Sequence, residues 1–81
     1  MKVRVRLFAV ARELAGAETI EIDAPLGTTI ADLRTLIAEA FPELGAALPR
    51  ILMAVDSEYA SSQTVVRPGA EVACIPPVSG G

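Results

Sequence analysis

The segment Lys2-Val3-Arg4-Val5-Arg6-Leu7-Phe8 alternates basic and aliphatic side chains near the start of the chain. This period of two is typical of a β-strand that has one face in the core and the other in water. The pattern predicts a first strand over residues 2–8 with its three aliphatic residues buried. Phe8 has the same parity as the basic residues, so in a regular strand it would point outward. A large apolar side chain is unexpected on a wet face, so we expect a twist at the strand end to tuck Phe8 in, and keep it as a candidate contact residue.

A second alternating segment, Thr19-Ile20-Glu21-Ile22-Asp23, predicts a strand that pairs with the first. Between the two, residues 9–16 are good helix formers that end in a glycine, so a short helical turn is expected there. In an antiparallel pair, Glu21 and Asp23 would face the basic side chains of the first strand and form exposed ion pairs. We therefore interpret the basic side chains as a solvated sheet face rather than an anion-binding site.

One amphipathic helix is expected after the second strand. Thr29 and Asp32 have the spacing of a capping box, and apolar residues then recur at helical spacing as far as Phe41. Pro42 disfavours helical geometry at the residue before it, so the helix should end at Phe41. Residues 43–50 then form a connector, which can hold another helical turn that buries Leu44 and Leu48.

The C-terminal half of the chain is predicted to hold two or three further strands. Residues 51–55 are a continuous apolar run of strand length, and Asp56-Ser57 can turn the chain toward Glu58-Tyr59. Residues 70–75 alternate again and form the last strand. We expect the first and last strands to lie together at the centre of the sheet.

This order of elements predicts an α+β fold in which one main helix packs across a small mixed sheet of four to five strands. Residues 1–75 would form this domain, and residues 76–81 an extended tail. Cys74 falls on the buried face of the last strand, where it acts as a small hydrophobic residue rather than a reactive thiol. Ile75 is left on the more exposed face.

Composition excludes several classes of function. The 81 residues carry a net charge of −3, which opposes nonspecific binding to nucleic acid. No apolar run approaches the roughly 20 residues that a membrane span requires. With one cysteine and no histidine, the chain lacks the groupings of a metal site or of an independent active site. We expect a cytoplasmic protein whose partners are proteins or small molecules.

The sequence ends in Pro76-Pro77-Val78-Ser79-Gly80-Gly81. The two prolines favour an extended course, so this segment is predicted to leave the domain as a semi-rigid arm. Gly80 and Gly81 have no Cβ and can pass through a narrow channel, and the last one carries the free α-carboxylate. Six residues reach roughly 20 Å, which is long enough to enter a partner's active site. A frayed chain end is the alternative reading.

Both ends of the chain resemble the MoaD-type sulfur carriers, which are small subunits of molybdopterin synthase with a ubiquitin-like β-grasp fold. The terminal motif is the most specific part, since thiamine-pathway carriers share Gly-Gly but usually lack the Pro-Pro-Val-Ser lead. Departures from the family pattern at Asp56, Ala70, and Cys74 or Ile75 concern partner fit more than chemistry. The matching stretches are Leu7-Phe8-Ala9, Arg12-Glu13-Leu14 with Gly16, Ala54-Val55, and Gly69-Ala70-Glu71-Val72-Ala73 running into the tail.

The resemblance implies that the chain carries sulfur as a non-catalytic subunit and binds no cofactor itself. A ubiquitin-activating-type adenylyltransferase would use ATP to adenylate Gly81, and a persulfide donor would convert it into a thiocarboxylate. The large synthase subunit would then direct this sulfur to cyclic pyranopterin monophosphate to form molybdopterin. Gly80 would provide clearance for the inserted tail.

The resemblance also implies which residues bind partners in the hetero-oligomer. Phe8, Tyr59 and Ile75 match positions that form an apolar docking patch in the family. That assignment agrees with the outward parity read separately for Phe8 and Ile75. The remaining partner-binding residues belong to the tail, namely Pro76, Pro77, Val78 and Ser79.

Three alternative functions remain compatible with the sequence. The first is a sulfur carrier for thiamine or cysteine biosynthesis, which only the identity of the sulfur acceptor separates. The second is a ubiquitin-like modifier that forms isopeptide bonds to lysine. The third is a passive β-grasp interaction module, for which loss of Gly80-Gly81 would change nothing.

Overall fold

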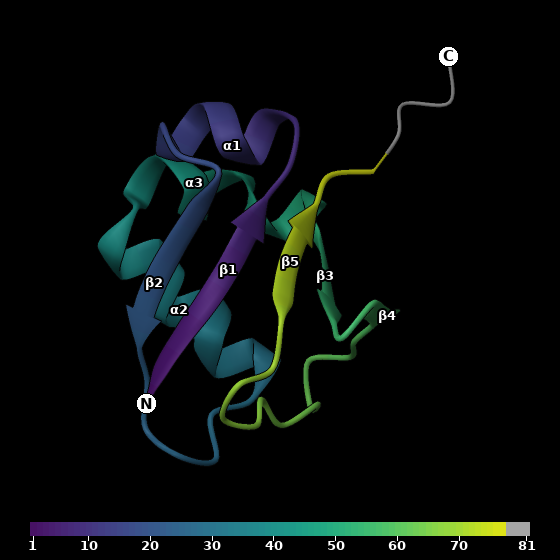
Figure 1. The fold of residues 1–81 in the computed structure, drawn as a ribbon. Helices are drawn as coiled ribbons and strands as arrows, with labels where there is room; N and C mark the ends of the chain where they lie inside the picture. Colours follow the sequence, from purple (N-terminus) through teal and green to yellow (C-terminus); the bar gives the residue numbers. More distant parts are fainter. Residues whose placement is uncertain (78–81) are drawn as a thin grey trace.

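The computed structural model describes residues 1–77 as a five-stranded mixed sheet with helices α2 and α3 across one face (Figure 1). The strand order is β2-β1-β5-β3-β4, which confirms the predicted α+β arrangement. The elements are β1 (Lys2–Leu7), α1 (Val10–Ala15), β2 (Thr19–Asp23), α2 (Ile30–Ala40), α3 (Pro42–Ala47), a 3₁₀ turn (Leu48–Arg50), β3 (Leu52–Val55), β4 (Glu58–Tyr59) and β5 (Val72–Ile75).

The first and last strands lie side by side near the middle of the sheet, as predicted. β1 runs antiparallel to β2 and parallel to β5, with Val5 opposite Val72 and Leu7 opposite Cys74. All four of these side chains are buried in one hydrophobic core together with residues of α2. β5 also pairs with β3 on its other side, so it is held by two neighbours. The chain therefore reaches its C-terminal segment from a fixed central position.

Helix α2 begins and ends where its sequence predicts. The Thr29 hydroxyl accepts a hydrogen bond from the Asp32 amide at 3.2 Å, and the Asp32 carboxylate accepts one from the Thr29 amide at 3.3 Å. This reciprocal pair satisfies two amide groups that the first turn leaves free. The helix ends before Phe41, and Pro42 opens α3. Half-buried Arg34 holds the connector by donating to two backbone carbonyls, those of Leu48 and Ile51.

Strand β1 is shorter than predicted. It ends at Leu7 rather than Phe8, because Ala9 turns the chain with a φ of 51°, a value that L-residues rarely adopt. The expected tucking-in of Phe8 does not occur, because 39% of its surface is exposed. The last strand likewise begins at Val72 rather than residue 70.

The predicted ion pairs between β1 and β2 are wrong. Arg4 lies opposite Glu21 and Lys2 opposite Asp23, but neither pair closes into an ion pair in the described part of the chain. Arg6 instead pairs with Glu71, with 3.2 Å between Nη1 and Oε1. The attraction between exposed charges on neighbouring strands is weak, because water screens it. It does not outweigh the side-chain entropy that would be lost by fixing the two side chains in an ion pair.

Cys74 is fully buried, as predicted. Its Sγ lies 3.3 Å from the Sδ of Met53. Burial raises the pKa of the Cys74 thiol to about 11, against a lowering influence from the Arg34 guanidinium. The thiol is therefore protonated at neutral pH and packs as an apolar group.

Within residues 1–77, no helix has the length and apolar character needed to cross a membrane.

Candidate functional site

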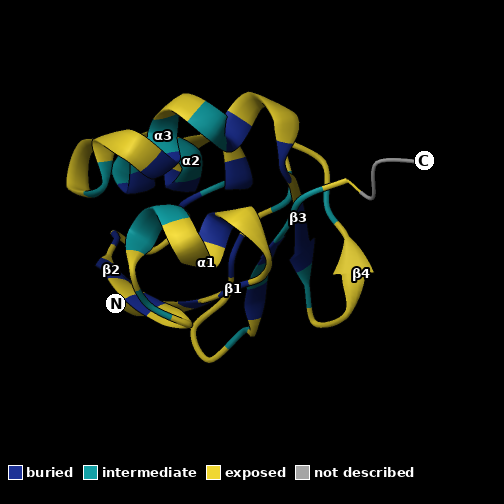
Figure 2. Cartoon of the chain, turned by 90° about the horizontal axis from the view of Figure 1, so that it is seen from above, coloured by how far each residue is buried: buried dark blue, intermediate teal, exposed yellow. Residues whose placement is uncertain are grey.

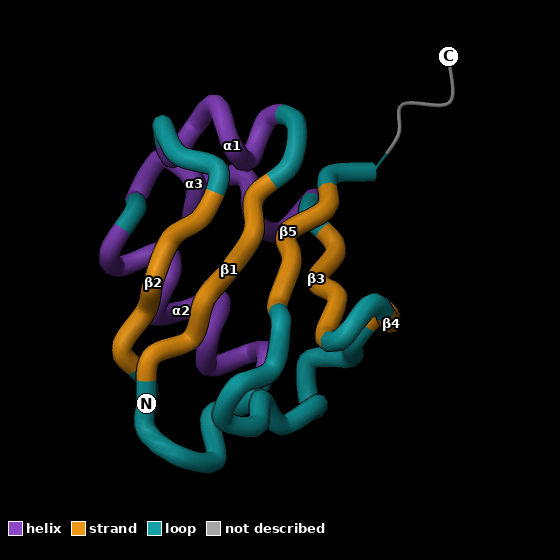
Figure 3. The backbone as a smooth tube through the Cα atoms, in the orientation of Figure 1, coloured by secondary structure: helices purple, strands orange, loops and turns teal. Residues whose placement is uncertain are grey.

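The candidate site begins where β5 delivers the chain to its C-terminal segment. Ile75 is the last paired residue, and the Cys74 carbonyl accepts a hydrogen bond from the Phe8 amide at 3.3 Å. Pro76 is half-buried and Pro77 is exposed. Figure 3 shows that this segment leaves at the end of the sheet next to α1. The remaining predicted site residues, Val78, Ser79, Gly80 and Gly81, lie outside the described residues.

The structure brings together the three side chains predicted to bind partners. Phe8, Tyr59 and Ile75 line one open hollow of about 290 Å³ on the sheet face opposite α2 and α3. The small residues Ala54 and Ala73 form its floor, because they lie opposite each other on β3 and β5. Figure 2 shows the helices gathered on one side of the sheet, with the exposed strand β4 at its margin.

Leu52 completes this surface, and sequence reasoning missed it. It lies opposite Ile75 in the β3–β5 pair, so the two side chains share a face, and 49% of its surface is exposed. Every residue from 51 to 55 is apolar, so composition cannot tell which side chains point inward. The register with β5 is what places Leu52 outside. We call Phe8, Leu52, Tyr59 and Ile75 the apolar patch.

A tight hairpin positions Tyr59. Asp56 and Ser57 both adopt the left-handed conformation, with φ values of 50° and 71°, and so reverse the chain between β3 and β4. The Asp56 amide donates to the Glu71 carbonyl at 2.8 Å, and its carboxylate accepts from the Glu71 amide at 3.0 Å. These bonds tie the hairpin to the segment before β5 and place Tyr59 opposite Ala54.

Arg6 borders the apolar patch. Its guanidinium carbon lies 5.3 Å from the centroid of the Phe8 ring, while its Nη1 contacts Glu71. A cation over an aromatic face is attracted by the ring quadrupole. Arg6 thus holds the Phe8 ring beside the strand and separates the apolar patch from the charged part of the sheet.

The apolar patch offers binding area rather than reactive groups. Its side chains are aliphatic or aromatic, and the only polar atom among them is the Tyr59 hydroxyl. Tyr59 is 72% exposed, and Phe8 and Leu52 lie beside the start of the C-terminal segment, since Leu52 is opposite Ile75 and the Phe8 amide bonds the Cys74 carbonyl. A partner covering the patch would therefore also lie next to that segment.

Comparison with known proteins connects this surface to a family. The sequence model of the ThiS family matches residues 5–81. The molybdopterin synthase sulfur carrier subunit of Arabidopsis thaliana is 33% identical over 81 residues, a match that covers 100% of this chain and 84% of the relative.

Two solved structures add to this comparison. The small archaeal modifier protein SAMP1 of Haloferax volcanii superposes with a TM-score of 0.90 at 28% identity, over 100% of both chains. A chain of the complex of subunits 1 and 2 of the molybdopterin-converting factor from Helicobacter pylori is 26% identical, with a TM-score of 0.70 and full coverage of both chains. These matches confirm the expected ubiquitin-like β-grasp fold.

Proposed function

This chain belongs to the ThiS family and is a sulfur carrier subunit of molybdopterin synthase in molybdenum cofactor biosynthesis, and we propose that it carries the sulfur at Gly81. The observation that carries this proposal is the match to sulfur carrier subunits along the whole chain, including the Gly80-Gly81 end. The geometry supports it, because β5 brings the chain to this end from the centre of the sheet.

The proposed chemistry begins with activation of the terminal carboxylate. A C-terminal carboxyl group has a pKa of about 3.3–3.7, so at neutral pH it is ionised and resists attack by a nucleophile. An activating enzyme would use ATP to join AMP to the Gly81 carboxylate, with release of pyrophosphate. The terminal sulfur of a persulfide would displace AMP, and a thiol would then cleave the S–S bond to leave the thiocarboxylate. The sulfur would be ionised and nucleophilic, as a thiolate is.

The proposed delivery step takes place on the large subunit of molybdopterin synthase. The apolar patch would dock that subunit, and Pro76-Pro77-Val78-Ser79 would extend into its active site. Gly80 would leave room for the thiocarboxylate to reach cyclic pyranopterin monophosphate. A complex of the two subunit types, as the Helicobacter pylori structure describes for its own proteins, would supply the acceptor site. The cytoplasmic location stays a prediction.

The test is reconstitution with the activating enzyme, ATP, a persulfide donor, the large subunit and the pyranopterin. A chain extended by one alanine after Gly81 should lose sulfur transfer, because its acyl end is displaced and crowded. Leu26→Ala, in the exposed loop between β2 and α2, leaves the C-terminal segment and the acyl end unchanged and should keep the activity. Equal circular dichroism and melting curves would show that both variants fold. Full activity of the extended chain would refute the proposal for Gly81.

A second candidate is a ubiquitin-like modifier of proteins, and the similarity to a small archaeal modifier protein is the observation that favours it. In that reaction a lysine amine, rather than a persulfide, would displace AMP from Gly81. Cells that express a tagged chain would then contain high-mass adducts that disappear when Gly81 is deleted. A thiamine or cysteine pathway carrier would instead differ only in the acceptor that receives the sulfur.

A further inference from the structure

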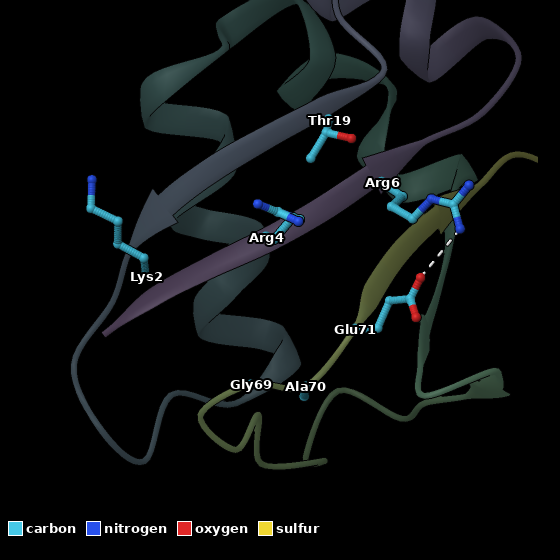
Figure 4. A pocket seen from close by; sticks show the side chains of 7 residues that line it. All are labelled: Lys2, Arg4, Arg6, Thr19, Gly69, Ala70 and Glu71. Atoms are coloured by element: carbon cyan, nitrogen blue, oxygen red, sulfur yellow. Dashed lines mark hydrogen bonds and ion pairs between the residues drawn. The ribbon is translucent and has the colours of Figure 1, made fainter.

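A basic hollow lies beside the apolar patch. Lys2, Arg4 and Arg6 project from the exposed face of β1, and we call them the basic stripe. Between β1 and the segment that leads into β5 is an open hollow of about 510 Å³ (Figure 4). It is lined by the basic stripe together with Thr19, Gly69, Ala70 and Glu71.

The hollow exists because β1 and β5 pair over only part of their length. Their parallel register runs from Val5 opposite Val72 to Leu7 opposite Cys74. Ahead of Val72 the chain turns through Gly69, whose φ of 82° suits a residue without Cβ. The first half of β1 therefore has a neighbouring strand on the β2 side only. Figure 4 shows the chain curving away below Arg4 and Glu71.

Two cations of the basic stripe make no ion pair in the described part of the chain. Arg6 contacts Glu71, but Lys2 and Arg4 leave Asp23 and Glu21 unbridged although those residues lie directly opposite them. The exposed sheet face consequently carries three bands in order. An acidic band on β2 comes first, the basic stripe on β1 follows, and the apolar patch lies beyond it.

We propose that the hollow receives carboxylate side chains of the large subunit of molybdopterin synthase while that subunit covers the apolar patch. This inference rests on the proposed function. A typical interface buries about 800 Å² on each partner, which corresponds to a footprint about 30 Å across. Arg4 on β1 and Phe8, which directly follows that strand, are four residues apart, or about 13 Å. A footprint of this width that covers Phe8 can therefore also cover the hollow.

A free small anion fits this hollow less well than a protein surface does. All three cations are exposed, so a lone phosphate or carboxylate would compete with water for each of them. A carboxylate of a partner protein is different, because burial of the apolar patch already holds that protein over the hollow. Its carboxylate therefore stays beside the cations although water also binds them. The chain's net charge of −3 does not oppose this, since charges more than about 10 Å away are largely screened at 0.1 M salt.

The order of the bands would also orient the partner. A large subunit shifted toward β2 would bring its carboxylates to Glu21 and Asp23, where like charges repel. Rotation on the apolar patch would move those carboxylates away from Arg4. The basic stripe would thus favour the orientation in which the C-terminal segment meets the active site.

The test is the association rate constant for the purified large subunit, measured by stopped flow at low and high salt. R4E should lower it about 3- to 10-fold at 50 mM salt, and R4Q by less, because electrostatic steering acts mainly on association. T35E makes the same charge change as R4Q but on an exposed residue of α2, which covers the other face of the sheet, and should have less than about a 2-fold effect. In 0.5 M salt the variants should converge.

The double variant R4E/E21R separates electrostatic steering of the partner from the local charge pair between β1 and β2. It keeps the net charge and an oppositely charged pair at this position of the β1–β2 register, but moves the cation from the hollow to β2. It should associate more slowly than the wild-type chain, with an unchanged melting curve. Association at the wild-type rate would overturn the inference and leave the proposed function standing. If the wild-type chain did not bind the large subunit at all, both would fall.

A second copy of this chain is the competing occupant, since its own acidic band could meet the basic stripe. Sedimentation equilibrium of the isolated chain should show a monomer. A dimer that R4E dissociates would assign the hollow to self-association and overturn the inference.

Discussion

Truncation of Tyr59 tests whether the apolar patch docks the large subunit. The Tyr59 ring is held in place by the β3–β4 hairpin, yet 72% of its surface faces solvent. An aromatic side chain offers about 200 Å² of surface, so about 140 Å² of Tyr59 is available to a partner. At about 25 cal/mol per Å², full coverage would be worth at most about 3.5 kcal/mol.

Partial coverage is the realistic case, because only a fraction of such area becomes net binding energy. If half of the exposed surface is buried, Tyr59→Ala should cost about 1.8 kcal/mol, which is a roughly 20-fold increase in Kd. The free energy of unfolding should fall by less than about 0.5 kcal/mol, since the change is at an exposed position. Isothermal titration calorimetry with the large subunit measures the first quantity, and urea denaturation measures the second.

Leu26→Ala is the matched control. Leu26 is 74% exposed, nearly as much as Tyr59, but lies in the loop between β2 and α2 rather than on the apolar patch. The control should bind with the wild-type Kd. Docking through the apolar patch would be refuted if Tyr59→Ala bound as tightly as the control, or if both variants weakened binding equally.

Two further predictions concern the core. Gly45→Ala would place a Cβ 2.6 Å from the Ala38 Cβ and 2.8 Å from its Cα, so α3 must move off α2. We expect the free energy of unfolding to fall by about 1–2 kcal/mol and the Tm in a thermal melt to fall by about 4–15 °C. An unchanged Tm would contradict this. Cys74 has a folded-state pKa of about 11 against an ordinary value of 9.0, so the folded state holds its proton more tightly and stability should fall as pH rises from 9 to 11. Relative to Cys74→Ala, wild-type urea stability should drop by about 2 kcal/mol between pH 8 and pH 10.5, and a constant difference would show that the thiol is not buried as described.

The fold was predictable where side-chain parity and capping chemistry act locally. Alternation along β1 identified its buried face, and the same reasoning placed Cys74 inside and Ile75 on the more exposed face. The reciprocal bonds of Thr29 and Asp32 set the start of α2, and Pro42 set its end. These signals depend on neighbours within a few residues, so the sequence contains them in full.

What could not be predicted depends on contacts between distant segments. Arg6 pairs with Glu71, which is 65 residues away, instead of a partner on β2. Leu52 became recognisable as part of the apolar patch only through its register with Ile75. The basic hollow likewise follows from where the β1–β5 pairing stops. None of these features can be predicted from the local periodicity of the sequence.

The sulfur-carrying role of the terminal glycine is open to one decisive measurement, the intact mass of the chain after incubation with the activating enzyme, ATP and a persulfide donor. Fragmentation should place a single oxygen-to-sulfur exchange at Gly81, and the added sulfur should be lost again when the large subunit and the pyranopterin are supplied. A chain whose mass stays unchanged, while the same reagents charge another sulfur carrier, would contradict the account.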